Sequence, residues 1–222
     1  MATRPPSVRE GRRLPTLTVF GLTGRTGQAV ATAALARGWS VRGFARPGST
    51  VPAALAGVTV VRGDFTDANL VAHAVAGADA VCCVLGPRPP YPEAFCAPAT
   101  TAIVEAMRQA GVRRLVCQTG ARVGTGNRTC VFAAMGRARA RRQPVAAHDR
   151  VEQERVVGES GLDWTIVKPP RLTDGPARHG VQVGPVLRVG MLSSISRADL
   201  AEFLLGTVDR AQHVGARVFV KG

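Results

Sequence analysis

The stretch Leu17–Gly27 reads Leu-Thr-Val-Phe-Gly-Leu-Thr-Gly-Arg-Thr-Gly. Its first four residues are apolar, β-branched and aromatic types that favour a strand. Small apolar residues at three- and four-residue spacing follow, which predicts a helix over 26–37. Gly21 and Gly24 therefore lie between a strand and a helix, and Gly27 lies in the first turn of that helix. Such a turn needs residues without Cβ, and the exposed N–H groups at the helix start can bind a diphosphate.

Beyond this loop, strands and helices alternate along the chain, which is typical of βαβ units and a parallel sheet. The expected strands cover residues 17–20, 40–45, 58–62, 78–85, 115–119, 164–167 and 217–220. The expected helices cover residues 26–37, 68–75, 94–110, 147–159 and 197–208. We therefore expect an α/β fold with a single Rossmann-like, doubly wound parallel sheet and helices on both faces.

The remaining segments indicate the domain organisation. Residues 1–14 are polar and contain several Arg and Pro residues, which predicts a flexible N-terminal arm. Residues 15–222 are expected to form one dinucleotide-binding domain, because no linker or internal repeat divides them. The segments 121–147 and 171–195 are expected to be substrate-side loops.

The chain is strongly basic. It has 222 residues, with 29 Lys and Arg against 15 Asp and Glu, and a formal net charge of +14. Lys168 and Lys221 are its lysines, so 29 − 2 leaves 27 arginines. This excess favours anionic ligands. Nucleic-acid binding is not expected, since no helix-turn-helix, zinc-finger or aromatic RNA-binding pattern accompanies the charge.

The cysteines and the apolar runs suggest where the protein works. Five cysteines contain no C-x-x-C pair, which favours reduced thiols, a cytoplasmic location and no metal site. These cysteines are Cys82, Cys83, Cys96, Cys117 and Cys130. No apolar run reaches the roughly 18 residues that a membrane helix needs, so membrane insertion is not expected.

The end of the second strand predicts which dinucleotide is bound. An NAD-binding protein usually has Asp or Glu there, which binds the ribose 2′-hydroxyl. Here the sequence is Phe44-Ala45-Arg46-Pro47, with Arg42 nearby. A guanidinium suits bidentate binding of a 2′-phosphate, which favours NADP(H). The alternative is that Arg46 is an ordinary surface residue of an Arg-rich chain.

Other polar residues can reach the same ligand. Thr23 and Thr26 can add hydroxyl donors to the glycine loop. Asp64 and Phe65 follow the third strand, where they can contact the adenine edge. The alternative for Asp64 is that its carboxylate caps the following turn.

Several motifs carry a resemblance to a known family. They are the glycine loop, Arg46, Gly63-Asp64, Val84-Leu85-Gly86, the run Glu159–Pro170 and the segment Ile195–Ala201. Together they resemble the NmrA-like atypical short-chain dehydrogenases/reductases, and most of all the biliverdin-IXβ reductase (NADPH flavin reductase) group. The resemblance covers residues 16–210, and its motifs are specific for fold and cofactor.

The resemblance implies a role for each matching residue. It implies that the pyrophosphate is held by Gly21, Thr23, Gly24, Arg25, Thr26 and Gly27, and the 2′-phosphate by Arg46. It places adenine at Asp64 and Phe65, the ribose side at Leu85, Gly86 and Arg88, and the nicotinamide at Thr119 and Pro169. Arg171 falls where flavin-type substrates would enter.

The chain departs from that family at the proton donors. The broader family has a Ser after the fifth strand and a Tyr-x-x-x-Lys on the next helix, which protonate the carbonyl being reduced. Here these positions fall at Gly120, near Ala146 and near Arg150, and the only tyrosine is Tyr91. A flavin or quinone stabilises the charge in its own ring. We therefore expect an NADPH-dependent reductase of a conjugated, often anionic small molecule: a flavin, a quinone or a biosynthetic intermediate.

Thr119 and His148 are the candidate catalytic residues. Thr119 either donates a hydrogen bond to a substrate carbonyl or only packs at the strand end. His148 begins the helix that normally carries the Tyr, and an imidazole is suited to acid–base catalysis; the alternative is a surface or capping residue. His179 and Arg171 are the candidate substrate-binding residues, with a plain surface position as the alternative for His179.

Two other functions remain open. The chain could be an NADP(H)-binding sensor or regulatory protein without redox turnover, which would dock a partner. It could also be a non-redox cyclase or isomerase on the same fold. The basic run Arg137–Arg142 either attracts an acidic ligand or forms a solvated loop. The resemblance favours a monomer, with a dimer as the alternative.

Overall fold

The computed structural model describes residues 14–86, 92–124 and 130–222, with the backbone alone for 130–132. Within these residues, one sheet has eight strands in the order β3-β2-β1-β4-β5-β6-β10-β8. Its strands are β1 (Thr16–Phe20), β2 (Ser40–Ala45), β3 (Val58–Arg62), β4 (Ala80–Cys83), β5 (Arg114–Gln118), β6 (Asp163–Lys168), β8 (Gln182–Gly184) and β10 (Ala216–Lys221). Neighbouring strands are parallel except β8, which pairs antiparallel with β10.

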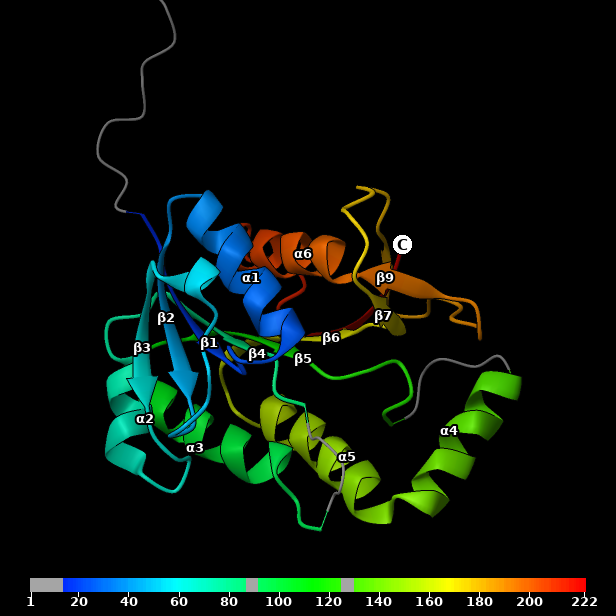
Figure 1. The fold of residues 1–222 in the computed structure, drawn as a ribbon. Helices are drawn as coiled ribbons and strands as arrows, with labels where there is room; N and C mark the ends of the chain where they lie inside the picture. The colour runs from blue at the N-terminus through cyan, green and yellow to red at the C-terminus, as the bar shows by residue number, and fades with distance from the viewer. Residues whose placement is uncertain (1–13, 87–91, 125–129) are drawn as a thin grey trace, which may run out of the picture.

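Helices cover both faces of the sheet, which confirms the doubly wound α/β fold. They are α1 (Arg25–Ala36), α2 (Ala68–Val75), α3 (Cys96–Gln109), α4 (Cys130–Arg142), α5 (Pro144–Gly158) and α6 (Arg197–Asp209), with a short 3₁₀ turn η1 (Ala53–Leu55). Figure 1 shows α1 and α6 on one face and α2, α3 and α5 on the other, while α4 extends away from the layers.

The alternation along β1 explains the two cores. Leu17 and Val19 point toward the layer of α1 and α6, and Phe20 points to the layer of α2, α3 and α5. All three side chains are fully buried, and each contributes about 1.5–3 kcal/mol by leaving water. Between them, the hydroxyl of Thr18 donates to the Ala74 carbonyl at 2.7 Å, so the polar group inside the sheet layer is satisfied.

The strand order creates a crevice next to β1. The chain builds β1, β2 and β3 outward in one direction, then returns to β4 on the other side of β1. The connections after β1 and β4 therefore leave the sheet toward opposite faces. In sheets of this kind, ligands bind outside the carboxyl ends of the strands at this reversal.

The segment 121–147, where the sequence predicts a loop with some helix, is largely helical in its described residues. Cys130–Arg142 forms α4, and α5 begins at Pro144 rather than at 147. Ala and Arg, which alternate in the second half of α4, are strong helix formers, so local propensity outweighs the absence of an apolar stripe. Pro144 suits the first turn of α5, where its missing N–H removes no hydrogen bond.

The segment 171–195 is also more ordered than the expected loop. It contains β7 (Arg171–Thr173) and reaches β9 (Ser194–Ser196), which pair in parallel with Leu172 opposite Ile195. Between them, β8 joins the edge of the main sheet. Short strands separated by Gly and Pro lack the length that makes a strand recognisable in sequence.

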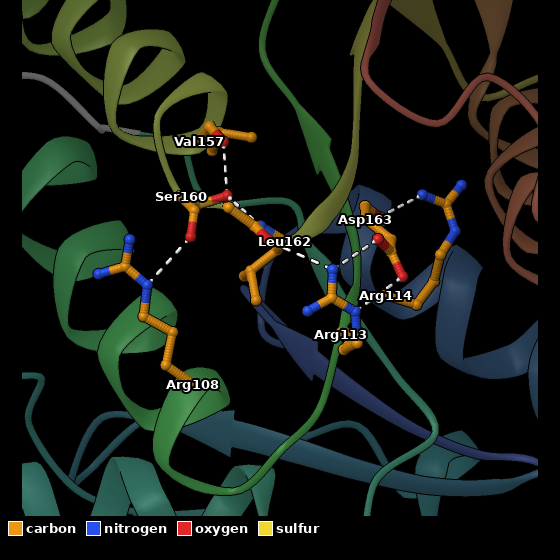
Figure 2. A network of polar contacts seen from close by, with 8 residues as sticks. Arg108, Arg113, Arg114, Val157, Ser160, Leu162 and Asp163 are labelled. Atoms are coloured by element: carbon orange, nitrogen blue, oxygen red, sulfur yellow. Dashed lines mark hydrogen bonds and ion pairs between the residues drawn. The ribbon is translucent and has the colours of Figure 1, made fainter.

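A polar network closes the turn between α5 and β6 (Figure 2). The Ser160 hydroxyl donates to the Val157 carbonyl at 2.7 Å, and the Ser160 carbonyl accepts from Arg108 Nε at 3.0 Å. Arg113 forms a bidentate pair with Asp163, with N···O distances of 3.0 and 3.2 Å. These contacts lie at the amino end of β6 and leave the carboxyl end for other chemistry.

The described residues, 14–86, 92–124 and 130–222, hold neither a membrane-spanning helix nor a metal-binding cluster. None of the helices is long and apolar enough to span a bilayer. Within the same residues, no group of three or more His, Cys, Asp or Glu side chains is arranged to hold a metal ion.

Candidate functional site

The glycine loop is shaped by close backbone contacts. Gly21 has φ of +93°, and a Cβ there would lie 2.9 Å from the Val84 carbonyl oxygen. A Cβ on Gly27 would overlap the Gly21 carbonyl oxygen, so α1 can pack this closely on the loop only with glycine. Gly24 closes the turn, with its N–H donating to Gly21 O at 3.0 Å. The three glycines therefore bring the start of α1 against the end of β1.

The N-terminus of α1 is open. Its N-cap residue is Gly24, and its first turn holds no acidic residue. In the part of the chain that the structure describes, no side chain caps its free N–H groups. In contrast, the Asp67 carboxylate caps α2 and the Ser196 hydroxyl caps α6. Unsatisfied N–H groups together with the helix dipole attract an anion. The loop thus fits a bound diphosphate.

A cavity of about 410 Å³ lies against this loop. Its described lining residues are Gly21, Thr23, Gly24, Phe44, Ala45, Arg46, Phe65, Val84, Leu85, Gly86, Pro92, Glu93, Ala94 and Phe95. The cavity joins the carboxyl ends of β1, β2 and β4, where the strand order reverses. It therefore includes seven of the residues expected to bind a dinucleotide: Gly21, Thr23, Gly24, Arg46, Phe65, Leu85 and Gly86.

Other expected cofactor residues lie outside this lining. Thr26 is buried in the first turn of α1. Arg25 is exposed and forms an ion pair with Asp174. Arg88 lies outside the described residues. Thr119 and Pro169 lie at the carboxyl ends of β5 and β6, farther along the same edge of the sheet.

Phenylalanine rings form one wall of the cavity. Phe44 and Phe65 have ring centroids 5.0 Å apart, and Phe65 contacts Phe95 edge to face at 5.7 Å. Phe20 supports the group from beneath, 5.5 Å from Phe44. Flat apolar surfaces of this kind suit an aromatic base. Sequence reasoning selected Phe65 but missed Phe44 and the segment Pro92–Phe95, because their contact with the loop depends on the path of the chain after β4.

Arg42 on β2 and Arg46 just after β2 have different roles. Arg42 donates to the carbonyls of His73, Ala74 and Ala76 at 2.7–3.2 Å, which closes the C-terminus of α2. Arg46 is exposed at the rim of the cavity, and in the described part of the chain its guanidinium makes no hydrogen bond. Arg46 is therefore the guanidinium that remains available to a ligand phosphate.

Asp64 fits the capping alternative. Its carboxylate accepts from the Thr66 N–H at 3.0 Å and from the Thr66 hydroxyl at 2.9 Å. These hydrogen bonds hold the pKa of Asp64 below its ordinary value, with a smaller contribution from Arg46. The carboxylate thus shapes the turn that places Phe65 in the cavity wall, and it is absent from the lining itself.

Thr119 belongs to a buried polar cluster. Its hydroxyl donates to Glu154 Oε1 at 2.7 Å, and Lys168 Nζ contacts the same oxygen at 2.5 Å. Lys168 also donates to the Val123 carbonyl at 2.8 Å. Burial lowers the pKa of Lys168, and Glu154 opposes that effect. Glu154 and Lys168 were missed from sequence, since a lone Glu and a lone Lys on separate elements give no motif.

Arg150, the residue near the family's Lys position, lies across two strand ends. Its Nη1 donates to Leu85 O at 2.8 Å and to Gln153 Oε1 at 2.7 Å, while Nη2 reaches Gln118 O at 3.3 Å. A cation is therefore retained between the carboxyl ends of β4 and β5. The helical spacing of Tyr-x-x-x-Lys is the signal that locates it.

His148 and Asp149 point in different directions. His148 is exposed on α5, where its charge lies close enough to Glu152 to lower the pKa of that carboxyl slightly, after the larger effect of Arg155. Asp149 is buried, and its carboxylate accepts from the N–H groups of Phe95 and its two successors. The exposed position favours the surface alternative for His148, and the capping role falls to Asp149.

The expected substrate-binding residues lie on the segment after β6. Arg171 is exposed at the start of β7. His179 is exposed, with φ of 56°, and its N–H donates to Asp199 Oδ1 at 2.9 Å. Asp199 thereby ties the loop of His179 to the start of α6. The described structure does not bring His179 and Thr119 into one cavity lining.

Solved structures share this fold over almost the whole chain. A short-chain dehydrogenase/reductase from Veillonella parvula, crystallised with NADP, matches with a TM-score of 0.78 and 17% identity over 95% of both chains. A putative NAD-dependent epimerase/dehydratase from Bacillus halodurans matches with a TM-score of 0.76 and 20% identity over 94% of both chains. The anaerobillin reductase ChuY from Escherichia coli matches with a TM-score of 0.74 and 21% identity over 92% of this chain and 96% of that one.

The sequence itself identifies the family. A family model described as NAD(P)H-binding matches residues 21–211, from the first glycine of the loop to just beyond α6. The match includes the open helix end, the aromatic wall and Arg46. The short-chain dehydrogenase-like neighbours agree with the resemblance to NmrA-like atypical members. The chain belongs to the NAD(P)H-binding family.

Proposed function

We propose that this protein is an NADPH-dependent reductase that transfers hydride to a conjugated small-molecule acceptor, such as a flavin, a quinone or a biosynthetic intermediate. The observation that carries the proposal is the cavity that joins the open N-terminus of α1 to the available guanidinium of Arg46. When bound, the dinucleotide would supply the hydride. The protein would hold the dinucleotide in place and exclude water from the site.

The residues of the cavity fit a phosphorylated dinucleotide. The glycines admit the pyrophosphate, the Phe44–Phe65 wall suits adenine, and Arg46 suits a 2′-phosphate. β2 ends without an acidic residue that would bind a 2′-hydroxyl. Glu93, in the segment after β4, is the acidic residue among the described lining residues of the cavity. The neighbour crystallised with NADP supports the same choice of cofactor.

The acceptor class follows from the groups at the family's proton-donor positions. The Ser position holds Gly120, and Ala146 stands near the Tyr position on α5. Thr119, beside the Ser position, has a hydroxyl that is hydrogen-bonded to Glu154. An acceptor that spreads negative charge over its own ring needs the least help from the protein. The neighbour described as an anaerobillin reductase supports a reductase on this fold.

The proposal includes the setting of the protein. Cys82, Cys83, Cys96 and Cys117 are free and buried, which fits a reducing compartment, so we propose a cytoplasmic location. We also propose a small-molecule substrate rather than nucleic acid, and a monomer as the working form. Gel filtration with light scattering tests the last point.

Calorimetry and steady-state assays test the function. NADPH should bind more tightly than NADH, and NADPH oxidation should be seen with at least one acceptor from a panel of flavins, quinones and enones. Tight binding without oxidation of NADPH would instead favour a sensor or regulatory protein. Conversion of a substrate without loss of the NADPH absorbance would favour a cyclase or isomerase, and failure to bind either dinucleotide would refute the proposal.

A further inference from the structure

Thr119, Glu154 and Lys168 form a buried polar cluster. The proposed hydride transfer gives the titratable side chains of this cluster, Glu154 and Lys168, no role. The Lys168 side chain is 1% exposed and that of Glu154 is 8% exposed. Both Lys168 Nζ and Thr119 Oγ1 contact the same carboxylate oxygen, at 2.5 and 2.7 Å. Three exchangeable groups are thus connected by two short hydrogen bonds.

Burial makes the charge state of this cluster adjustable. Removing an ammonium from water opposes its ionisation, so burial narrows the free-energy difference between charged and neutral Lys168. Burial lowers the pKa of Lys168; Glu154 on α5 raises it, and Arg217 on β10 and Arg150 on α5 lower it further. An arginine at position 168 would stay charged at any working pH, whereas a lysine can release its proton.

One end of the cluster, Thr119, lies at the edge of the sheet where a substrate would bind. Thr119 immediately follows β5, at the edge of the sheet where ligands of this fold bind. Thr119 is 5% exposed and Lys168 is 1% exposed, and the Lys168 ammonium lies against the Val123 carbonyl and 5.6 Å from the Phe219 ring centroid. The Thr119 oxygen can accept one hydrogen bond while it donates another. A proton can therefore travel outward from Lys168 through Glu154 to Thr119.

We propose that Lys168, Glu154 and Thr119 form a proton relay that protonates the acceptor after it receives hydride. In the resting structure the Thr119 hydroxyl donates to Glu154, so the relay begins when this hydroxyl turns its proton toward the acceptor. The Thr119 hydroxyl proton then passes to the acceptor's anionic heteroatom, the Lys168 ammonium gives a proton to the Glu154 carboxylate, and the resulting carboxylic acid gives one to Thr119 Oγ. Lys168 is left as a neutral amine, and after the product leaves, a proton from water returns to it through Thr119 and Glu154, because Lys168 itself is 1% exposed. The relay rests on the proposed function, because it needs an acceptor beside Thr119.

A purely structural role is the competing explanation. Through Lys168 and Val123, the cluster fixes the loop that follows β5, so its loss could disturb the site without any proton transfer. The test must therefore separate proton delivery from loop position. Two acceptors do so: a quinone needs hydride and a proton to form a hydroquinone, whereas a cationic phenothiazinium dye becomes neutral on taking hydride alone.

Thr119→Val removes the hydroxyl and keeps the shape of the side chain. With NADPH, the relay predicts a fall of roughly 100-fold in kcat for the quinone, the lower end of general-acid contributions. The rate with the phenothiazinium dye should stay within about twofold, as for a change that leaves hydride positioning intact. Thr119→Ser should restore the quinone rate. Thr207→Val, at a buried hydroxyl bonded within α6, is the matched control.

The double variant Glu154→Gln with Lys168→Met removes both buried charges together. It also removes the partner of Arg217, which lies 3.7 Å from Glu154 Oε2 and is about half exposed to water. Replacing a buried pair in this way is often neutral for stability. The relay predicts the same selective loss with the quinone, and loss of the pH dependence of kcat that Lys168 introduces. An equal loss with both acceptors in every variant would mean that the cluster only positions the loop, and would overturn the relay.

Lysine NMR gives a readout that needs neither cofactor nor turnover. Isotope-labelled lysine yields two side-chain signals, Lys168 and Lys221, and Lys221 is the internal reference. Burial should hold the pKa of Lys168 below the ordinary value of a lysine, and Glu154→Gln should lower the pKa of Lys168 further. An ordinary lysine pKa for Lys168 would refute the relay. If the wild-type protein reduces neither acceptor, the proposed function fails with it; if it reduces both and Thr119→Val changes neither rate, only the relay fails.

Discussion

The N-termini of α1 and α3 have the same kind of free N–H groups, and the chain treats them in opposite ways. At α3, the buried Asp149 carboxylate accepts from Phe95, Cys96 and Ala97 at 2.8–3.1 Å. At α1, no side chain of the described residues accepts a hydrogen bond from these N–H groups. The chain supplies its own anion to α3 and leaves α1 for an anion from outside. A helix end that the protein itself has satisfied is structural, and an open one beside a cavity is a ligand site.

The largest expected effect is a loss of NADPH affinity in a variant that disturbs the open N-terminus of α1. Gly27→Ala places a methyl group against the Gly21 carbonyl, so α1 and the loop must separate. NADPH affinity measured by calorimetry should fall at least about 100-fold, or roughly 2.7 kcal/mol. Gly184→Ala is the control, since a Cβ there meets nothing within 4 Å. Unchanged affinity in Gly27→Ala would show that the diphosphate binds elsewhere.

The next largest expected effect is a loss of stability when the cap at the N-terminus of α3 is removed. Asp149→Ala leaves three N–H groups of α3 without their acceptor, which should lower the free energy of unfolding by about 2–3 kcal/mol. Asp149→Asn keeps one acceptor oxygen and should be milder. Chemical denaturation measures both variants. Equal stability of Asp149→Ala and the wild-type protein would mean that α3 does not depend on this cap.

Arg46 and Arg42 allow ligand binding and stability to be separated. Arg46→Gln should weaken NADPH binding about 10-fold, because it removes a charge-assisted contact with the 2′-phosphate. NADH affinity should stay the same, since NADH lacks that phosphate. Arg42→Gln should lower stability instead, through the lost contacts with α2, and keep the ratio of NADPH to NADH affinity. A parallel loss of both affinities in Arg46→Gln would contradict the assignment.

The smallest effect is expected at α2. Asp67→Ala removes the acceptor for the Asn69 and Leu70 N–H groups, a cap whose loss typically costs about 1 kcal/mol. Thermal unfolding should show that loss, and NADPH affinity should not change. A lower NADPH affinity in Asp67→Ala would extend the ligand site to α2 and blur the distinction between closed and open ends.

The regular parts of the fold could be predicted from sequence because their signals are local. The bounds expected for residues 40–45, 58–62 and 68–75 match β2, β3 and α2, since apolar runs and an Asp cap mark their ends. α4 could not be predicted in this way. Its arginines and alanines favour a helix, but no apolar stripe shows which neighbour it packs against.

The candidate site also contains residues that could be predicted from local sequence and residues that could not. The glycine loop and Arg46 are consecutive in sequence with the elements they serve, so their roles follow from spacing. The cavity wall at Phe95 and the pair of Glu154 and Lys168 depend on segments that meet only in three dimensions. Asp149 illustrates the point: its partners are more than fifty positions away, so no local pattern could distinguish it from His148 as the functional neighbour.

The ion pair between Arg25 and Asp174 joins the flank of the phosphate loop to the segment after β7, and Arg197 holds the other carboxylate oxygen at 2.5 Å. Exposed pairs of this kind contribute little stability, so they exchange partners readily. A dinucleotide phosphate that attracted Arg25 would release Asp174 from one of its two cations. Occupancy of the loop and the arrangement of residues 171–195 are then thermodynamically linked, and a ligand bound by either one must shift the affinity of the other by the same factor.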